Sequence, residues 1–408
     1  MRTVPATLAL ALALVADALP AQTIAWLNEP GGVAVARDAA DNVYTARWDY
    51  NPGGDIHVAR RDAAGTLIWE ERFDNLDGTR HEVATFVAAD SGGNVLVSGT
   101  VRSGFANPVN AASVLMKFAP DGALLWRRVY GGDFDGSSTR RLVIDPEDRA
   151  HVLGLGVCPA GLMATVRRFD ADGSAGWTWC DQAGVGQPTM IKRTPDGQFV
   201  IAGRGLIGAV QGFARIDAQG RTVWSLVGIP SPTAGDIAGD AEGNSYVVFA
   251  EPAGPGTRLR KLSPAGEILW ERSHPMSAFR VEVAPDGSPV LGGFPGANAG
   301  GAAFARFSAA GDLLWTNPDA SGVGLLLHSA MLVDAGGSAY LSGSTLVAMG
   351  VAKVAADGST AWSVLLPGGT STGMALGSAN QVYVSGGIYA ARIDQAPADA
   401  VFADGFES

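Results

Sequence analysis

Hydrophobic and polar residues alternate with a period of two along most of the chain. Short alternating runs flank turns built from Asp, Gly and Asn, as in FVAADSGGNVLVSG and EVAPDGSPVLGG. This alternation on both sides of a tight turn is typical of a two-stranded antiparallel hairpin. The pattern therefore predicts a protein built from β-hairpins.

One kind of hairpin occurs eight times, in segments such as VARDAADNVYTA, KRTPDGQFVIAG, MLVDAGGSAYLSG and ALGSANQVYVSG. A second kind has a Gly four residues before a Trp, as in APDGALLW and DAQGRTVW, and occurs seven times in succession. The seven pairs are Gly65/Trp69, Gly122/Trp126, Gly173/Trp177, Gly220/Trp224, Gly266/Trp270, Gly311/Trp315 and Gly358/Trp362. The two hairpins alternate, so each repeat supplies four short strands, which is the blade of a β-propeller.

The two ends of the chain indicate how many blades there are. The eighth hairpin of the first kind ends at Gly386 and is followed by GIYAARID, a third strand with no Trp hairpin after it. The missing fourth strand is present near the N-terminus, in TIAWLNEP around Trp26. Closing a ring in this way removes exposed sheet edges. We predict an all-β, eight-bladed β-propeller closed by its N-terminal strand; seven blades is the alternative.

We interpret the eight tryptophans as structural. A Trp at a fixed place in every blade is expected to pack between neighbouring sheets while its N–H finds a carbonyl. The Asp that precedes many of the turn glycines is expected to hydrogen-bond the turn backbone.

At these residues the chain resembles two groups of bacterial repeats. DAQGRTVW and APDGALLW resemble the repeat of eight-bladed, quinoprotein-like (PQQ-like) propellers, although the Asp-to-Gly spacing here is one residue shorter. The stretch from Asp90 to Gly132 resembles the secreted bacterial β-propeller repeat family more closely, through GGNVLVSGT, SVLMKFAPDGALLW and YGG. The resemblance implies the fold and little about function. Quinoprotein dehydrogenases would also require adjacent cysteines and a calcium-ligating set; Cys158 and Cys180 are far apart, so we expect no cofactor.

The N-terminus reads MRTVPATLALALALVADALPAQT, in which Arg2 precedes an apolar run that ends with small residues. This is the pattern of a cleaved secretory signal peptide. The apolar run ends at Asp17 and is too short to span a membrane. We expect a signal peptide over residues 1–21, a propeller domain over 22–394 and a tail over 395–408, in a secreted or periplasmic protein. The tail, QAPADAVFADGFES, is either a frayed end or a recognition tag.

Charge and cysteine content narrow the partners. A net charge of −11 argues against nucleic acid and against anionic lipid as partners. No later run is long and apolar enough to predict a membrane span, and we expect a monomer. In an exported protein two cysteines favour a disulfide, free thiols being the alternative. Cys158 and Cys180 are expected to end the second and fourth strands of the third blade, with the loop CPAG arching between them.

Candidate binding residues were sought where the repeats differ. Connections from the second to the third strand, and from one blade to the next, meet on one face of a propeller and vary widely in length here. The longest flank the second blade, at 71–84, 101–112 and 127–140. They concentrate these candidate residues: Asp74, Asp77, Arg80, His81, Glu82, Arg102, Tyr130, Asp133, Asp135 and Arg140.

No sequence motif identifies a reaction. DFDG and DADG begin like a calcium loop but have no closing Glu, and the five His residues lack zinc-like spacing. We therefore expect no catalytic, metal or cofactor residues. The favoured hypothesis is an exported, non-enzymatic propeller that binds a protein, glycan or cell-envelope component. A polysaccharide hydrolase or lyase and an envelope assembly scaffold are the alternatives; two carboxyls about 5–10 Å apart at the channel mouth would favour a glycosidase.

Overall fold

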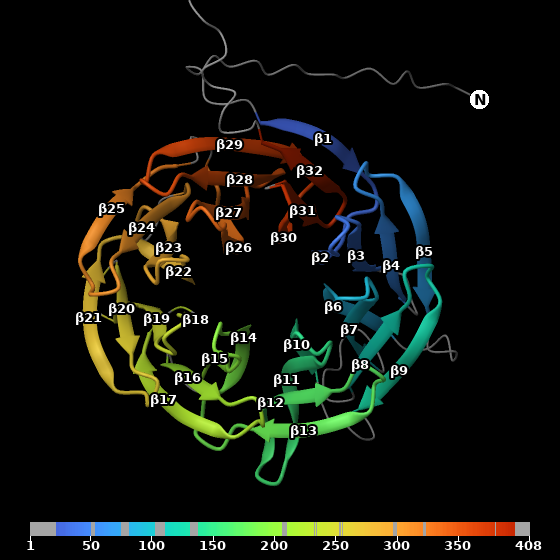
Figure 1. Ribbon diagram of the computed structural model, residues 1–408, viewed down its shortest axis with the longest axis horizontal. Helices are drawn as coiled ribbons and strands as arrows, with labels where there is room; N and C mark the ends of the chain where they lie inside the picture. The colour runs from blue at the N-terminus through green and yellow to red at the C-terminus, as the bar shows by residue number, and fades with distance from the viewer. Residues whose placement is uncertain are drawn as a thin grey trace, which may run out of the picture.

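The computed structural model describes residues 22–395 except 50–53, 75–80, 103–110, 131–137, 206–209, 232, 234, 253, 255, 297–299, 321–323 and 380. This part of the chain contains 32 strands and no helix, and therefore no helix able to cross a membrane. The strands form eight four-stranded antiparallel sheets around a central axis (Figure 1). The predicted eight-bladed propeller is confirmed, and the seven-bladed alternative is wrong.

The blades follow one another along the chain. Blades 1 to 3 are β2 (Ala34–Arg37), β3 (Val43–Trp48), β4 (Ile56–Arg61), β5 (Leu67–Phe73); β6 (His81–Ala89), β7 (Val95–Arg102), β8 (Ala111–Phe118), β9 (Leu124–Tyr130); and β10 (Ser138–Ile144), β11 (Ala150–Cys158), β12 (Gly161–Phe169), β13 (Ala175–Cys180). Blades 4 and 5 are β14 (Gln187–Arg193), β15 (Phe199–Arg204), β16 (Val210–Ile216), β17 (Thr222–Pro230); and β18 (Asp236–Gly239), β19 (Ser245–Ala250), β20 (Thr257–Leu262), β21 (Ile268–His274).

Blades 6 and 7 are β22 (Ser277–Val283), β23 (Pro289–Phe294), β24 (Ala303–Phe307), β25 (Leu313–Asn317); and β26 (Leu327–Val333), β27 (Ala339–Ser344), β28 (Ala348–Val354), β29 (Thr360–Pro367). Blade 8 contains β30 (Ser371–Leu376), β31 (Val382–Gly386), β32 (Ala390–Asp394) and, from the other end of the described chain, β1 (Thr23–Asn28). β1 pairs antiparallel with β32, with Trp26 opposite Arg392. The predicted closure of the ring by the N-terminal strand is thereby confirmed (Figure 1).

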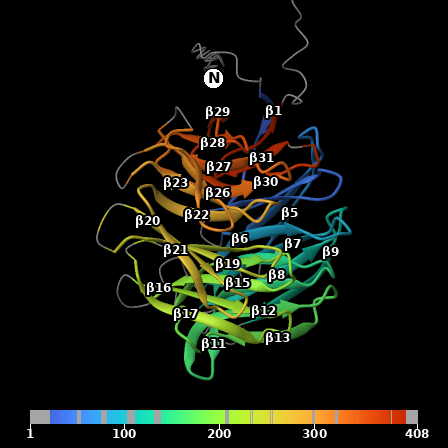
Figure 2. The ribbon, with the colours of Figure 1, turned by 60° about the vertical axis from the view of Figure 1, so that its left-hand side comes forward.

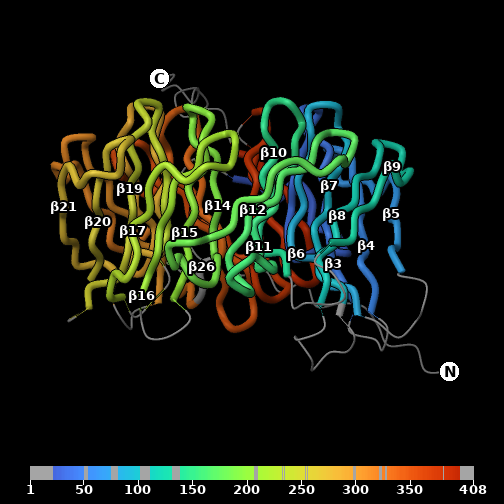
Figure 3. The backbone as a smooth tube through the Cα atoms, turned by 90° about the horizontal axis from the view of Figure 1, so that it is seen from below, coloured from blue at the N-terminus to red at the C-terminus, as the bar shows by residue number. Residues whose placement is uncertain are grey.

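The position of a strand in its blade decides its surroundings. The first strand of each blade lies next to the central axis and the fourth lies on the circumference (Figure 1). β19 and β27, second strands, are buried along their whole length, whereas the outer strand β5 is largely exposed. Seen edge-on, the strands run from one face of the ring to the other (Figure 3). One face therefore carries the short turns, and the other, called the loop face below, carries the variable connections.

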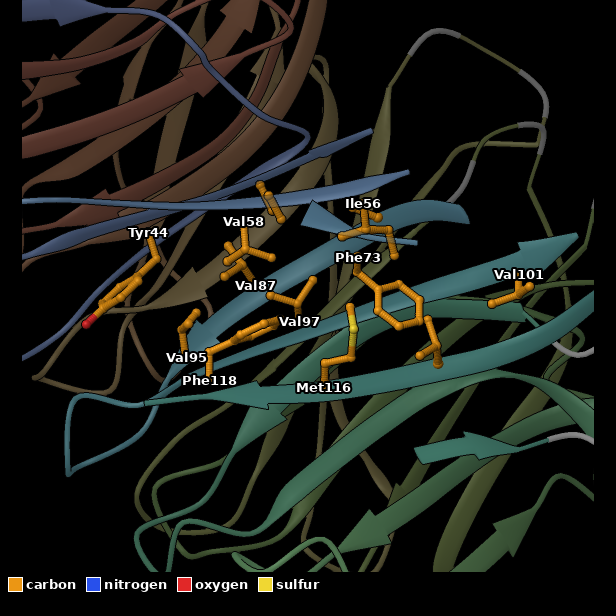
Figure 4. Packing of buried hydrophobic residues seen from close by; sticks show 14 residues of the cluster. Tyr44, Ile56, Val58, Phe73, Val87, Val95, Val97, Val101, Met116 and Phe118 are labelled. Carbon is orange, nitrogen blue, oxygen red and sulfur yellow. The ribbon is translucent and has the colours of Figure 1, made fainter. Parts of the chain in front are cut away.

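The hydrophobic core is a series of layers between neighbouring blades, which stack around the ring (Figure 2). Between blades 1 and 2, Tyr44 and Val58 form one buried cluster with Val97 and Met116 (Figure 4). Such a protein is stabilised mainly by contacts between nearest neighbours, as in other repeat proteins. A substitution in one layer should therefore act locally.

The Gly-x-x-x-Trp motif joins each blade to the next. Trp177 lies against Gly220 of the following blade, and its Nε1 donates a hydrogen bond to Ala218 O at 3.0 Å. The same contact of a Trp with the next blade's turn glycine occurs in the pairs Trp26/Gly65, Trp69/Gly122, Trp126/Gly173, Trp224/Gly266, Trp270/Gly311 and Trp315/Gly358. The predicted packing of the Trp side chains between neighbouring blades is thus observed.

Two tryptophans depart from the hydrogen-bonding pattern. Trp224 Nε1 is buried and has no hydrogen-bond acceptor among the described residues. Trp362 faces blade 8, whose third and fourth strands come from opposite ends of the chain, so no turn carbonyl lies there. Gln395 Oε1, at 3.4 Å from Trp362 Nε1, takes its place.

Cys158 and Cys180 form the predicted disulfide, with their Cα atoms 6.1 Å apart. In the strand ladders Cys180 is opposite Thr165 of β12, whereas Cys158 is opposite Gly161, four residues further along. Four residues of a flat strand span about 13 Å, so the end of the β11–β12 hairpin must fold back toward β13. Strand pairing in the β11–β12 hairpin thus continues up to Cys158, and the bent end of this hairpin brings the two cysteines together. The expected open loop over CPAG is not present.

Candidate functional site

The predicted binding patch on the loop face is only partly described. Asp77, Arg80, Asp133 and Asp135 lie outside the described residues, as does the side chain of Arg102. Asp74, directly after β5, is exposed and His81 is half-buried. The grouping of all ten residues into one surface stays a prediction.

Two residues of the patch contribute to packing between strands and blades. Glu82 is 1% exposed, and its backbone N–H donates to Gly54 O of the preceding blade at 2.8 Å. The Tyr130 ring packs against Phe169 at 5.1 Å between centroids, and burial raises the pKa of its hydroxyl. Arg140, by contrast, is exposed and belongs to a cationic site in the channel.

The strands that line the channel share one irregularity. Six of them carry a β-bulge at the same place; the extra residues are Thr85, Arg140, Thr189, Phe279, Ser329 and Thr372. Where this residue is Ser or Thr, its hydroxyl donates to a backbone carbonyl, as Thr189 does to Ala202 O at 3.1 Å. Blades 3 and 6 lack this hydroxyl and have Arg140 and Phe279 instead. Among the six blades with a bulge, blades 3 and 6 therefore differ from the other four at the channel wall.

The next position in each first strand forms a ring at one level of the channel. By strand register its members are Ala34, Phe86, Arg141, Met190, Asp236, Arg280, Ala330 and Gly373. The two arginines directly follow the two bulges without a hydroxyl. The residues two positions further along the same strands form a second ring. In this second ring only Lys192 and Glu282 are charged. At these two levels of the channel, the charged side chains all come from blades 3 to 6.

Lys192, Asp236 and Glu282 form an ion-pair cluster in which one ammonium group contacts two carboxyl groups. Lys192 Nζ lies 2.9 Å from Asp236 Oδ2 and 2.8 Å from Glu282 Oε1. Burial alone would lower the pKa of Lys192, but the two carboxylates raise it above its usual value. Burial raises the pKa of Glu282. The fully buried Asp236 also accepts backbone N–H groups from Ile237 and Val281, at 2.8 and 3.1 Å.

Arginines line the channel opening on the loop face. A cavity of about 470 Å³ there is lined by Arg140, Arg141, Arg204 and Arg280, together with Gln187, Pro188, Thr189, Met190 and Gly235. We call the four arginines the cationic mouth. Among the described residues, no carboxylate lines this cavity.

The charges of the cationic mouth are poorly compensated. Arg280 donates to the carbonyls of Phe279 and Ser329, each at 3.0 Å. Arg141 lies over the Phe86 ring, 5.2 Å from its centroid, and its guanidinium has no hydrogen bond or ion pair to any described residue. Burial, and then the neighbouring Arg280, lower the pKa of Arg141 to about 10. A partly buried cation without an ion pair is less stable than a solvated one, and an anion placed beside it offsets that cost.

Within the described part of the chain, the cavity at the channel mouth is not lined by a pair of free carboxyls. Asp236 and Glu282 are close neighbours because both contact Lys192, a separation compatible with a glycosidase pair. However, Asp236 is buried and both of its oxygens accept hydrogen bonds. The geometry therefore favours structural charge neutralisation deep in the channel and anion binding at its opening.

One group of side chains has the composition of a metal site. Asp49, Asp55 and His57, in blade 1, place one potential ligand atom each within 4.8 Å of one another. Sequence reasoning missed this group because it considered the histidines by their spacing from each other. The spacing Asp-x₅-Asp-x-His around a strand-to-strand connection was the available signal.

Sequence reasoning also missed most of the cationic mouth. Only Arg140 was among the predicted residues. The signal was present in alignment of the repeats, since RRLVIDP and FRVEVAP place Arg141 and Arg280 where five of the other six copies have small or apolar residues and one has Asp236. It was overlooked because the expected binding residues were sought in the longest connections.

Comparisons with known proteins show the fold. No family model matches the chain, and no curated protein matches its sequence. The structure is similar to that of a streptogramin B lyase, with a TM-score of 0.52 and 11% identity over 91% of this chain and 98% of that one. It is also similar to the Dos1 propeller, with a TM-score of 0.57 and 10% identity over 92% and 94% of the two chains. At such identities the likeness shows a β-propeller and no activity; kinship with the secreted or quinoprotein-like repeats stays a prediction.

Proposed function

We propose that this protein is an exported, non-enzymatic binding protein that takes up an acidic, carboxylate-bearing glycan of the cell envelope at the cationic mouth. The observation that carries the proposal is the cavity lined by four arginines, of which Arg141 is half-buried beside Phe86 and forms no ion pair with a described residue. Export rests on the expected signal peptide over residues 1–21, which lie outside the described part of the chain.

The chemistry of the mouth favours a carboxylate. A guanidinium group presents two parallel N–H donors that match the two oxygens of a carboxylate. The chain as a whole carries a net charge of −11, so a cluster of four arginines in one cavity is a local exception to the surface charge. Such a cavity in a low-dielectric wall focuses its field on an approaching anion.

The rest of the lining favours a sugar over a simple anion. The volume of about 470 Å³ lies in the range of small-molecule sites. Gln187 and Thr189 are polar side chains at the wall, whereas Phe86 and Met190 offer apolar surface at the adjoining deeper level. Polar groups for hydroxyls beside apolar surface for a ring face suit a uronic acid residue.

Binding is tested by calorimetry on the full chain with oligogalacturonates, neutral cello-oligosaccharides and acidic peptides. We expect binding of the uronate oligomers, weakened when salt is raised from about 0.05 to about 0.5 M. Arg141→Gln and Arg280→Gln should each reduce affinity by about ten- to a hundred-fold, because each removes a charge-assisted hydrogen bond.

Arg221→Gln is the matched control, since Arg221 is 76% exposed on the short-turn face and should leave binding unchanged. Preference for acidic peptides, or equal binding by the Arg141 and Arg280 variants, would contradict the proposal. Release of reducing ends from the oligosaccharides would instead support the alternative of a polysaccharide-cleaving enzyme.

A further inference from the structure

We infer that Asp49, Asp55 and His57 form a binding site for a divalent transition metal ion such as Zn²⁺ on the loop face of blade 1. Asp49 follows β3 directly, Asp55 precedes β4, and His57 is the second residue of β4. The reversal of the chain between these strands brings the three ligand atoms within 4.8 Å of one another. The inference is independent of the proposed glycan binding.

Two of the potential ligand atoms are buried without a hydrogen-bond partner in the described part of the chain. Asp55 is 1% exposed; its Oδ2 is held by Arg72, whereas its Oδ1 has no hydrogen-bond partner. His57 Nε2 likewise makes no hydrogen bond and lies 3.5 Å from Asp49 Oδ2. Buried polar atoms are normally satisfied, and an unsatisfied one costs about 1–3 kcal/mol. A cation bound between them would satisfy both.

The donor set selects the class of metal. One imidazole nitrogen with carboxylate oxygens suits Zn²⁺ and neighbouring transition metals, whereas Ca²⁺ and Mg²⁺ prefer oxygen alone. Tetrahedral zinc with bonds of about 2.0–2.2 Å places its ligand atoms about 3.3–3.6 Å apart. The Asp49–His57 separation of 3.5 Å already meets this condition, and the ligand atom of Asp55, within 4.8 Å of both, has to move closer.

The surrounding charges support a cation at this point. Arg47 Nη2 lies 3.1 Å from His57 Nδ1 and donates to Glu70 Oε1 at 2.7 Å, while Glu70 Oε1 lies 3.4 Å from Nδ1. Metal binding at Nε2 therefore requires Arg47 to release Nδ1, so that Nδ1–H can donate to Glu70 instead. Arg47 fixes Glu70 through a contact of 2.7 Å, and Arg72 fixes Asp55. Around His57, the three carboxylates of Asp49, Asp55 and Glu70 outnumber the two guanidinium groups of Arg47 and Arg72.

The site is accessible from solvent. The side chains of Asp49 and His57 are 27% and 15% exposed, so a metal held by three protein ligands would keep an open position toward water. The arginines of the cationic mouth come from blades 3, 4 and 6, whereas Asp49, Asp55 and His57 belong to blade 1 (Figure 1). Metal binding and glycan binding can therefore be measured separately.

The test is Zn²⁺ titration of the untagged full chain after chelator treatment, followed by calorimetry and by the absorption spectrum of the Co²⁺ form. We expect one equivalent of Zn²⁺ to bind, to raise the midpoint of thermal unfolding, and to be preferred over Ca²⁺. His57→Gln and Asp49→Asn should each weaken binding at least about tenfold, and Glu70→Gln about ten- to a hundred-fold.

Asp121→Asn is the charge-matched control, because Asp121 is exposed in a short turn of blade 2 on the opposite face; Zn²⁺ binding should be unchanged. Arg141→Gln should also bind Zn²⁺ normally, which separates failure of this site from failure of the glycan proposal. Circular dichroism of each variant establishes that it is folded. Absence of stoichiometric binding, equal binding by folded His57→Gln, or preference for Ca²⁺ would overturn the inference.

Discussion

The contact between Trp177 and Gly220 of the next blade allows us to predict how one added methyl group at Gly220 changes stability. Gly220 has a φ of +76°, and a Cβ added to it would lie 2.4 Å from Trp177 Cε3 and 2.6 Å from Cδ2. Contacts that short do not occur, so in Gly220→Ala the indole ring or the turn has to move. The Trp177 Nε1 bond to Ala218 O, in the same turn, limits how far they can move.

The magnitude combines two effects. An alanine forced into the left-handed region costs about 1–2 kcal/mol. Overpacking a well-packed contact costs about a further 1–3 kcal/mol. We therefore expect Gly220→Ala to lower the free energy of unfolding by about 2–5 kcal/mol.

Gly228 supplies the control for the backbone effect. Its φ is +72°, but a Cβ there would meet no atom within 4 Å. Gly228→Ala should therefore lose only about 1–2 kcal/mol. Urea unfolding followed by tryptophan fluorescence and circular dichroism measures both variants. Equal losses in the two would refute the argument that the Trp contact constrains the turn glycine.

Two further predictions concern stability. Replacing both Cys158 and Cys180 by Ser should lower the free energy of unfolding by about 3 kcal/mol, because a loop with a sequence separation of 22 is no longer closed in the unfolded chain. Urea unfolding measures this loss. An unchanged free energy of unfolding would show that the hairpin needs no covalent tether. Burial lowers the pKa of His274, whose Nδ1 accepts the Met276 N–H at 3.2 Å. As the pH falls below about 6.5, the unfolded chain therefore binds a proton at His274 before the folded chain does, and the stability that the neutral, buried imidazole contributes is lost. The decrease in urea midpoint from pH 7 to 5 should be smaller in His274→Gln; an unchanged decrease would contradict the assignment.

Local sequence was enough to predict the scaffold. Each hairpin is marked by its own alternation and turn residues, and each blade by one Gly-x-x-x-Trp motif, so the blade count required only neighbouring residues. Trp26 identified the strand that completes blade 8 because the repeat had one strand missing. The pairing of Cys158 with Cys180 was predictable because both lie within one blade.

The candidate sites depended on the tertiary structure. Arg141 and Arg280 are separated by more than two repeats along the chain and share a cavity only because the first strands of all blades surround one axis. Arg141 is partly buried beside Phe86 and Arg280 without forming an ion pair to any described residue, an environment that no local pattern encodes.

Asp49, Asp55 and His57 are close in sequence, yet their side chains converge only through the geometry of the connection between β3 and β4. The sequence by itself thus determined which strands form and how the ring closes, since those depend on short-range periodicity. The tertiary structure decided where charge is left uncompensated, because that depends on which distant residues fill the space around each group.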